Sequence, residues 1–451
     1  MTLFGTDGIR GKTNVEPMTV ETILRVAKAI GCVLMKKAPN RRHKVLIGKD
    51  TRLSGYMFES ALESGLCSMG VEVLQVGPIP TPGIAYLTES MRADIGIVIS
   101  ASHNPYEDNG IKFFNEDGFK ISDELENEIS RLVLHPEEIT QFKANTTNIG
   151  KASRLEDAVG RYISYLKQFL SKKHTLNGLK VVVDCANGAS YKIAPTIFSE
   201  LGADVVPFGV TPNGKNINEN CGAMYPEILR EKVLQEKASI GIALDGDGDR
   251  VVFCDDKGNI YDGDDFLSII SEQEEIYPEV KKGIVGTVMT NFGLEKKFEK
   301  KKIPFYRSDV GDRYVVEKMK EKNAMFGAEA SGHIISLKRS TTGDGILSAL
   351  LLLNILQKRK MPLSSFFQSF DRYPHQVKSI RVKEKKPFEQ IPTVQKSIQN
   401  AEKQLHGNGR VLVRYSGTES KVRVMVESES SSLVHTLVDE ISLAIEKAIG
   451  V

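Results

Sequence analysis

ADIGIVISASHNPYEDNGIKFF, residues 93–114, begins as an apolar run and continues into a polar loop. Ile95 and Ile97 recur within a short apolar segment, which is typical of a buried strand. The run gives way to Ser-Ala-Ser-His-Asn-Pro at 100–105, and Lys112 follows downstream. Small hydroxyls, a histidine and a lysine directly after such a strand indicate a ligand-binding loop, because ligands of α/β proteins bind beyond the carboxyl ends of the strands.

The same layout recurs along the chain. ADIGIVIS (93–100) and ASIGIALD (238–245) share alanine, isoleucine, glycine and isoleucine in register. Each closes a segment that reads strand, helix, short strand, helix, strand, and a fainter third copy spans 283–333. Apolar runs that alternate with helical stretches predict parallel strands joined by helical crossovers. The earlier strands expected for the first two copies are 44–52 with 69–77 and 180–188 with 201–209.

The last part of the chain has a different pattern. We expect a strand at 376–382, a helix at 391–405, strands at 410–415 and 421–427, and a closing amphipathic helix. The chain is therefore predicted to fold as three related α/β domains with mixed sheets in tandem, followed by a smaller α+β domain. The expected domain limits are 1–150, 151–255, 256–370 and 371–451.

Composition narrows the class of protein. Lysine and arginine number 60 against 58 aspartates and glutamates, so the net charge is only +2 and gives no basic field for nucleic acid. The five cysteines show no C-x-x-C spacing, which argues against disulfides or a zinc knuckle and fits a reducing cytosol. The most apolar window, 346–356, is too short to span a bilayer, and the start of the chain has no apolar leader. We expect a cytoplasmic protein with neither nucleic acid nor membrane as partner.

The repeats place three polar loops at equivalent positions. After the last strand of each repeat come Ser-Ala-Ser-His-Asn-Pro (100–105), Asp-Gly-Asp-Gly-Asp-Arg (245–250) and Glu-Ala-Ser-Gly-His (329–333). The first loop offers a nucleophile, the second a cage for a cation, and the third polar groups that can form hydrogen bonds. Their positions indicate one shared site.

The second loop has the composition of a metal site. Asp245, Asp247 and Asp249 alternate with glycines, and three carboxylates this close repel one another unless a hard divalent cation such as Mg²⁺ lies among them. Arg250 could share a phosphate with that metal. The loop matches a calcium-binding EF-hand only in part, because Arg250 replaces the sixth-position glycine and Asp256 the twelfth-position glutamate. An acidic turn that binds nothing is the other alternative.

Ser102 is the candidate nucleophile of the first loop. The chain has no G-x-S-x-G elbow for acyl transfer, so we expect Ser102 to carry a transferable phosphate, with Mg²⁺ and basic side chains neutralising its charge. A helix cap or a turn is the alternative role for this serine alone. His103 either supports the serine loop or is a plain turn residue. Arg10, in GTDGIRG, and Lys112 are candidate proton shuttles and charge clamps.

The predicted fourth domain carries RYSGTESKVR (414–423) between two strands. Guanidinium groups, hydroxyls and backbone N–H groups in such a turn can hold a phosphate. An ordinary solvent-facing hairpin is the alternative. The candidate phosphate ligands are Arg414, Ser416, Gly417, Thr418 and Arg423.

Together these motifs resemble those of the α-D-phosphohexomutase family. The similarity rests on GTDGIRG, SASHNPYEDNGIKFF, DGDGDR, EASGH, STTGDG and RYSGTES, in that order, and covers nearly the whole chain. It implies four domains around one cleft, and a phosphoserine at Ser102 that passes its phosphate to a sugar phosphate and takes the other phosphate back. Asp245, Asp247 and Asp249 would hold Mg²⁺ together with the Ser102 phosphate.

The resemblance also implies roles for the third loop. Glu329 and Ser331 would bind sugar hydroxyls, and His333 with Lys112 would act as acid/base or charge-stabilising groups. The 327–333 loop departs from the usual pattern at Ala328 and Ala330.

Among family members, the motifs favour those that act on a hexosamine phosphate, interconverting glucosamine 6-phosphate and glucosamine 1-phosphate. Glucosamine 1,6-bisphosphate, or a similar hexose bisphosphate, would act as primer, and kinship suggests a homodimer. A phosphomannomutase/phosphoglucomutase is the nearest alternative. A sugar-phosphate sensor without activity is the alternative of another class.

Overall fold

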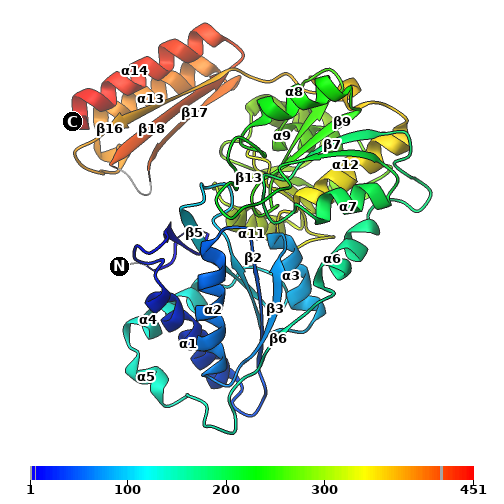
Figure 1. Ribbon diagram of the computed structural model, residues 1–451. Coiled ribbons are helices and arrows are strands. Elements are labelled where there is room, and N and C mark those ends of the chain that lie inside the picture. Colours follow the sequence, from blue (N-terminus) through cyan, green and yellow to red (C-terminus); the bar gives the residue numbers. More distant parts are fainter. Residues whose placement is uncertain (1–2, 6, 417–419) are drawn as a thin grey trace.

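Four sheets organise the chain, and each defines one domain, numbered I to IV in chain order. The computed structural model describes residues 3–5, 7–416 and 420–451. Domains I to III follow one another, and domain IV lies to one side of them (Figure 1). The α/β class with a smaller last domain, predicted from the sequence, is confirmed.

Domain I contains a six-stranded sheet in the order β1-β5-β4-β2-β3-β6. β2 pairs in parallel with both β3 and β4, whereas β5 returns antiparallel beside β4. Its strands are β1 (Ile9–Lys12), β2 (Lys44–Lys49), β3 (Glu72–Pro78), β4 (Ile95–Ile99), β5 (Asp108–Asn115) and β6 (Ala152–Arg154). Its helices are α1 (Val20–Lys37), α2 (Ser54–Cys67), α3 (Thr81–Ser90), α4 (Asp123–Leu134) and α5 (Glu137–Thr140).

Domains II and III repeat the central arrangement of domain I. Their sheets run β11-β10-β9-β7-β8 and β13-β12-β14-β15, so each has a first strand between a second and a third, followed by an antiparallel return. The threefold repeat predicted from the sequence is therefore confirmed, including its faint third copy. The strands of domain II are β7 (Lys180–Asp184), β8 (Asp204–Phe208), β9 (Ile240–Leu244), β10 (Val251–Asp255) and β11 (Ile260–Tyr261). Those of domain III are β12 (Ile284–Thr287), β13 (Phe305–Ser308), β14 (Phe326–Ala328) and β15 (Ile334–Ser336).

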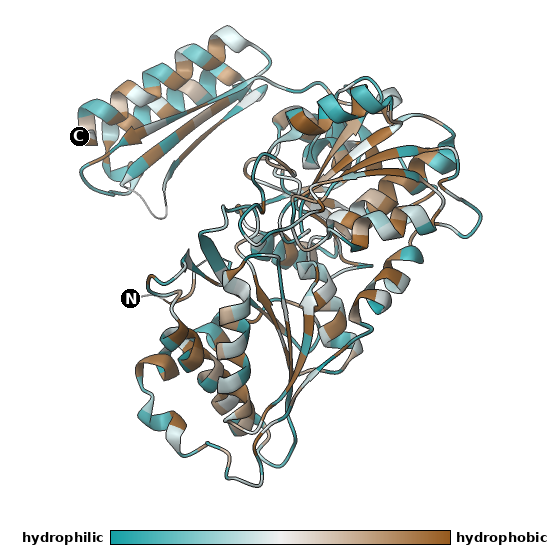
Figure 2. Ribbon diagram, viewed as in Figure 1, coloured by the Kyte–Doolittle hydropathy of each residue, from teal (hydrophilic) through white to brown (hydrophobic). Residues whose placement is uncertain are grey.

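Helices cover these sheets with their apolar sides, while apolar residues run along the strands (Figure 2). The helices of the second and third parts are α6 (Ala158–Lys167), α7 (Ile193–Glu200), α8 (Pro226–Glu236), α9 (Gly263–Ile270), α10 (Phe292–Lys301), α11 (Asp312–Lys322) and α12 (Gly345–Arg359). Short 3₁₀ turns lie at η1 (Pro278–Lys282), η2 (Leu363–Phe366) and η3 (Phe388–Gln390).

The most apolar stretch of the sequence forms α12, which is buried from Gly345 to Leu356. It packs against α6, β9, β10 and β15, so it joins domain III to domain II. Buried side chains from Leu46 in domain I to Phe370 form one continuous apolar cluster. The burial of α12 is thus explained by packing between domains. No helix of the described chain is both long and apolar enough to cross a bilayer.

Domain IV has its own apolar core and a three-stranded antiparallel sheet in the order β16-β18-β17. The sheet is covered by two helices, as Figure 1 shows. The strands are β16 (His375–Arg381), β17 (Gly409–Tyr415) and β18 (Lys421–Ser428), and the helices are α13 (Pro392–Leu405) and α14 (Ser431–Ile449). Each of these elements was expected from the sequence, and their order is confirmed.

Candidate active site

The loops that follow β4 and β9 meet at the boundary between domains I and II. The Ser102 hydroxyl, in the first loop, donates a hydrogen bond to Asp245 Oδ2 at 2.7 Å in the second. Both side chains are buried. A Cβ at Gly246 would lie only 2.6 Å from the Ser102 carbonyl oxygen, so the two loops approach this closely because residue 246 is glycine.

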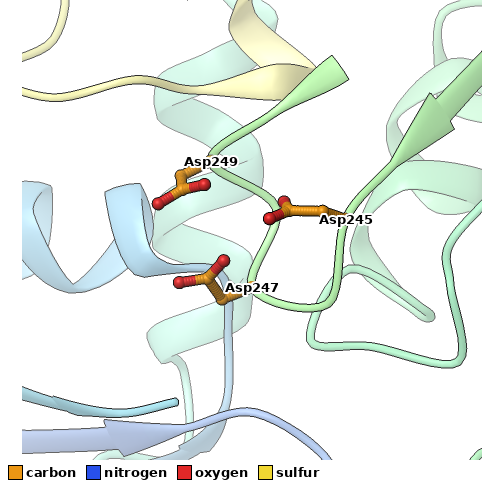
Figure 3. A group of neighbouring side chains, drawn as sticks. All are labelled: Asp245, Asp247 and Asp249. Atoms are coloured by element: carbon orange, nitrogen blue, oxygen red, sulfur yellow. The ribbon is translucent and has the colours of Figure 1, made fainter. Parts of the chain in front are cut away.

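The acidic loop gathers its three carboxylates at one point. Asp245, Asp247 and Asp249 each offer an oxygen, and these oxygens lie within 4.8 Å of one another (Figure 3). Asp247 Oδ1 and Asp249 Oδ1 are buried and have no hydrogen-bond partner among the described residues. Burial, together with the charges of Asp249 and Asp247, raises the pKa of Asp245 well above its ordinary value. Convergent, buried oxygen ligands with unpaired lone pairs fit a hard divalent cation.

Lys112 supplies a positive charge to this acidic loop. It lies on β5 opposite Val98 of β4, and its Nζ is 2.9 Å from Asp247 Oδ2 and 3.0 Å from Asp249 Oδ2. Burial alone would lower the pKa of Lys112, but Asp247, Asp249 and Asp7 raise it well above its ordinary value. The lysine is therefore a fixed ammonium ion at neutral pH.

Charged side chains of domains I and III form a chain of ion pairs that begins at the N-terminal motif. Arg10, on β1, forms an ion pair with Asp7, and Asp7 also accepts a hydrogen bond from Lys120. Lys120 in turn donates to Asp312 Oδ1 at 2.6 Å, at the start of α11 in domain III. Burial would raise the pKa of Asp7, but Lys112, Lys120 and Arg10 hold it well below its ordinary value. The sequence analysis missed Asp7, Lys120 and Asp312, because these residues are far apart in the chain and their charges meet only through tertiary packing.

The third loop lies against the second. Arg250 forms an isolated antiparallel bridge with His333, and the His333 ring lies between Asp249 and Asp312, with ring nitrogens 3.7 Å from each carboxylate. Burial alone would lower the pKa of His333, but Asp249 and Asp312 raise it above its ordinary value. Burial alone would also lower the pKa of Arg250, but Asp249 and Asp245 raise it above its ordinary value.

Glu329 and Ser331 occupy the same loop. Glu329 Oε1 accepts a hydrogen bond from the backbone N–H of Gly311 at 2.6 Å, while the Ser331 hydroxyl lies 3.3 Å from Glu329 Oε2. Glu329 is buried and Ser331 is exposed. These predicted sugar ligands therefore lie beside the acidic loop, where polar groups from domains II and III meet.

His103 contacts the candidate nucleophile directly, because its Nδ1 lies 3.3 Å from Ser102 Oγ. Burial, with the charges of Arg250 and Arg10, lowers the pKa of His103 to about 4. The ring is thus neutral at physiological pH. Of the two roles left open for His103, this contact favours support of the serine loop.

The candidate phosphate loop belongs to domain IV. Arg414 and Arg423 face each other in the β17–β18 ladder, and the N–H of Ser416 donates to the carbonyl of Lys421 at 2.8 Å. Gly417 and Thr418 lie outside the described residues. Within the described chain, no hydrogen bond or ion pair joins Arg414, Ser416 or Arg423 to domains I to III. The structure therefore brings together the predicted residues of the first three loops, but not those of the fourth.

Comparisons with known proteins agree with this architecture. Residues 1–140 match the family described as phosphoglucomutase/phosphomannomutase, alpha/beta/alpha domain I. Residues 160–258, 262–373 and 378–444 match its domain II, its domain III and its C-terminal domain. A solved phosphoglucomutase/phosphomannomutase family protein from Burkholderia thailandensis has a TM-score of 0.82 at 23% identity, covering 99% of this chain and 97% of its own. The fold and site thus define a phosphohexomutase, and the chain belongs to the phosphoglucomutase/phosphomannomutase family.

Several relatives that are similar over the whole chain carry a more specific name within the family. A phosphoglucosamine mutase from Myxococcus xanthus is 50% identical over 450 residues, covering 100% of this chain and 98% of its own length. A phosphoglucosamine mutase from Anaeromyxobacter dehalogenans is 49% identical over 456 residues, covering 99% of each chain. A solved N-acetylphosphoglucosamine mutase from Aspergillus fumigatus, in complex with GlcNAc-6P and magnesium, has a TM-score of 0.65 at 19% identity and covers 99% of this chain and 96% of its own.

Proposed function

We propose that the protein interconverts glucosamine 6-phosphate and glucosamine 1-phosphate, as a phosphoglucosamine mutase. The observation that carries the chemistry is the hydrogen bond from Ser102 to Asp245, inside a buried cluster of carboxylates and basic groups. The choice of glucosamine rests on relatives about half identical over the full chain.

Ser102 would carry the transferable phosphate. The bond between Oγ and phosphorus breaks as the free hydroxyl oxygen of the sugar phosphate bonds to phosphorus, and the proton of that hydroxyl passes to a base on this chain. The bisphosphate then turns round and returns its other phosphate to Ser102, so no phosphate is gained or lost. Glucosamine 1,6-bisphosphate, or a similar bisphosphate, would prime the serine.

The surrounding side chains would share the charge and the proton. Mg²⁺ bound by Asp245, Asp247 and Asp249 would draw negative charge from the phosphoryl oxygens. Lys112, whose pKa is raised by its carboxylate neighbours, and the guanidinium of Arg10 supply positive charge, so we assign both to charge stabilisation. We assign the proton transfer to His333, because its imidazole ring lies between Asp249 and Asp312 beside the acidic loop.

The remaining predicted residues would hold the sugar phosphate. We assign Arg250 to the phosphate shared with the metal, and Glu329 and Ser331 to sugar hydroxyls. The phosphate that does not react would bind in domain IV. Its proposed ligands are Arg414, Ser416, Gly417, Thr418 and Arg423.

Three further expectations accompany the proposal. The product would supply UDP-N-acetylglucosamine and cell-wall precursor synthesis in the cytoplasm. We expect a homodimer. The domain limits 1–150, 151–255, 256–370 and 371–451 stay as proposed from the sequence, although the sheets of domains I and II extend a few residues past the first two, to β6 and β11.

The decisive experiment measures turnover of the phosphorylated enzyme, with Mg²⁺, on glucosamine, glucose and mannose phosphates. We expect kcat/KM to favour glucosamine phosphate by about a hundredfold or more, which corresponds to roughly 2.7 kcal/mol. Equal rates on glucose or mannose phosphate would instead identify a general hexose mutase. A Ser102→Ala variant should bind sugar phosphate but not turn it over, whereas turnover by that variant would exclude the phosphoserine mechanism.

A further inference from the structure

The candidate nucleophile has an unusual backbone conformation. Ser102 has φ of +52°, in the left-handed region that residues with a Cβ rarely adopt. Its N–H donates to Ser100 Oγ at 2.9 Å, and the residue is buried. A strained conformation persists only where neighbouring groups over-determine it. The loop around Ser102 must therefore be held by contacts other than its own turn.

Arg52 provides one set of these contacts from beneath the loop. This arginine is fully buried, and its Nη2 donates to the carbonyl oxygens of Ser102 at 3.0 Å and Asn104 at 2.8 Å. Its Nη1 donates to the carbonyl of Pro105. The guanidinium thus binds three carbonyls of one loop, which its planar set of donors is suited to do.

Asp50 holds that guanidinium in place. Asp50 Oδ2 accepts from Arg52 Nε at 2.8 Å and from the Ser100 hydroxyl at 2.6 Å. Since Ser100 Oγ receives the N–H of Ser102, the chain of hydrogen bonds returns to the serine loop. Arg52 and the backbone N–H of Ser102 are therefore linked through one buried carboxylate.

Asn218, which belongs to domain II, binds two of the same carbonyl oxygens. Its Nδ2 donates to the Ser102 oxygen at 2.9 Å and to the Asn104 oxygen at 3.1 Å. Asn218 itself has φ of +59° and is buried. A Cβ at Gly246 of the acidic loop would lie 2.8 Å from this amide nitrogen, so the acidic loop passes close to Asn218. Asn218 therefore ties the serine loop of domain I to domain II, close to the acidic loop.

These donors fix the direction of the Ser102–His103 peptide. In a trans peptide the C=O and the N–H point to opposite sides. Because the Ser102 carbonyl is drawn toward Arg52 and Asn218, the N–H of His103 points away from both. Within the described chain this N–H has no hydrogen-bond partner. It is a free donor on the residue next to the nucleophile.

We propose that Arg52 and Asn218 are positioning residues, which hold Ser102 in its left-handed conformation and present the His103 N–H to the phosphoryl group. The inference rests on the proposed role of Ser102 as phosphate carrier. Neither side chain touches the substrate. Their effect is to set the place and direction of Oγ relative to the acidic loop, so it concerns the rate of phosphoryl transfer more than sugar binding.

The test compares Asn218→Gly with Asn220→Gly. Both asparagines have positive φ in one loop, which glycine tolerates, but Asn220 is exposed and its side chain makes no hydrogen bond to the serine loop. We expect N218G to lose about 30-fold or more in kcat with KM changed less than about threefold, because misplacement by about 1 Å costs on the order of a hundredfold. N220G should behave as the wild type.

Two direct readouts accompany the steady-state constants. The first is the rate at which ³²P-labelled enzyme passes its phosphate to sugar phosphate in a single turnover, which should fall in N218G. The second is the melting temperature, which should show that both glycine variants are folded at the temperature of the assay. If N218G matched N220G in kcat and in transfer rate, the inference would be wrong.

An arginine variant keeps the inference testable if N218G does not fold. Arg52→Lys retains the charge beside Asp50 but cannot bind three carbonyls at once, so we expect a fall in kcat of about tenfold or more at nearly constant KM. Arg42→Lys, on an exposed side chain, is the matched control. Wild-type kcat in R52K would overturn the inference. The assays use whichever hexose phosphate the wild type turns over, so a wrong sugar assignment would appear in the wild type alone.

Discussion

Lys112 and the acidic loop balance each other in a buried site. The lysine lies within 3.4 Å of carboxylates from Asp7, Asp247 and Asp249. Burying charges is costly, and their mutual attraction compensates only while both signs are present. Removing the lysine leaves several buried carboxylates without their nearest cation.

We therefore expect Lys112→Met to destabilise the metal-free protein, by up to about 3–5 kcal/mol. Mg²⁺ should restore part of this loss, because the same carboxylates would then bind the metal. Turnover should fall by about a hundredfold or more. Unfolding monitored with EDTA and with Mg²⁺ measures both effects, with Lys112→Arg as the variant that keeps the charge. A K112M protein as stable as the wild type in EDTA would contradict this account.

At the scale of elements, the sequence predicts those strands, helices and loops that a local pattern of residues determines. The strand expected at 238–245 is β9, and the helix expected at 391–405 is α13, because apolar period and turn residues are local signals. The acidic triad was also visible, since its three residues are neighbours in sequence. The roles assigned to the site residues stay predictions.

The contacts of Arg52 and Asn218 with the serine loop could not be predicted. They join residues about 50 and 116 positions apart, and no repeat or spacing in the sequence marks them. Lys120 and Asp312 escaped notice for the same reason, because they lie 192 positions apart and nothing in the local sequence of either marks the other as its partner. Local pattern therefore located the loops, but only tertiary packing determines which charges meet there.

The N-terminus of α12 gives a prediction about pH. The Asp344 side chain caps this helix, accepting from the N–H of Leu347 at 2.9 Å and from the Tyr162 hydroxyl at 2.6 Å. Burial raises the pKa of Asp344 from 3.8 to about 6. The folded state therefore binds the Asp344 proton more tightly than the unfolded state does. The protonated carboxyl contributes fully to the free energy of unfolding below about pH 4, and this contribution is lost as the pH rises through about 6.

Asp344→Asn should remove the pH-dependent contribution of this carboxyl to stability. Asparagine also caps helices, and the Tyr162 hydroxyl can accept a hydrogen bond from the new amide. From about pH 4 to about pH 7, we expect the wild-type free energy of unfolding to fall relative to that of D344N by up to about 3 kcal/mol. Denaturant unfolding across this range measures it. D344A, which loses the cap, should be less stable at every pH, and parallel curves for the wild type and D344N would exclude the effect.

At the scale of the whole molecule, Arg410 and Glu427 join domain IV to domain III. Arg410 of β17 donates to the carbonyls of Val288 at 2.6 Å and Thr290 at 2.8 Å, and its Nε pairs with Glu427 at 2.7 Å. Glu427 also accepts the N–H of Phe292 at 3.0 Å. Tyr373 also connects the two parts, because it exchanges hydrogen bonds with Asn291 and its hydroxyl donates to Glu429. Polar contacts such as these position domain IV, because its apolar core is separate from that of domains I to III.

Arg410→Met should loosen this joint. The variant loses the two hydrogen bonds to domain III, worth about 1 kcal/mol each, and also the pairing with Glu427, so domain IV should occupy a wider range of positions. If domain IV holds the phosphate that does not react, KM should rise by about tenfold, which corresponds to about 1.4 kcal/mol, while kcat changes less. Small-angle scattering with and without sugar phosphate, together with steady-state kinetics, measures both effects. The control is Arg381→Met, an exposed position on β16 of the same domain. An R410M protein with wild-type scattering and KM would show that Arg410 does not set the position of domain IV.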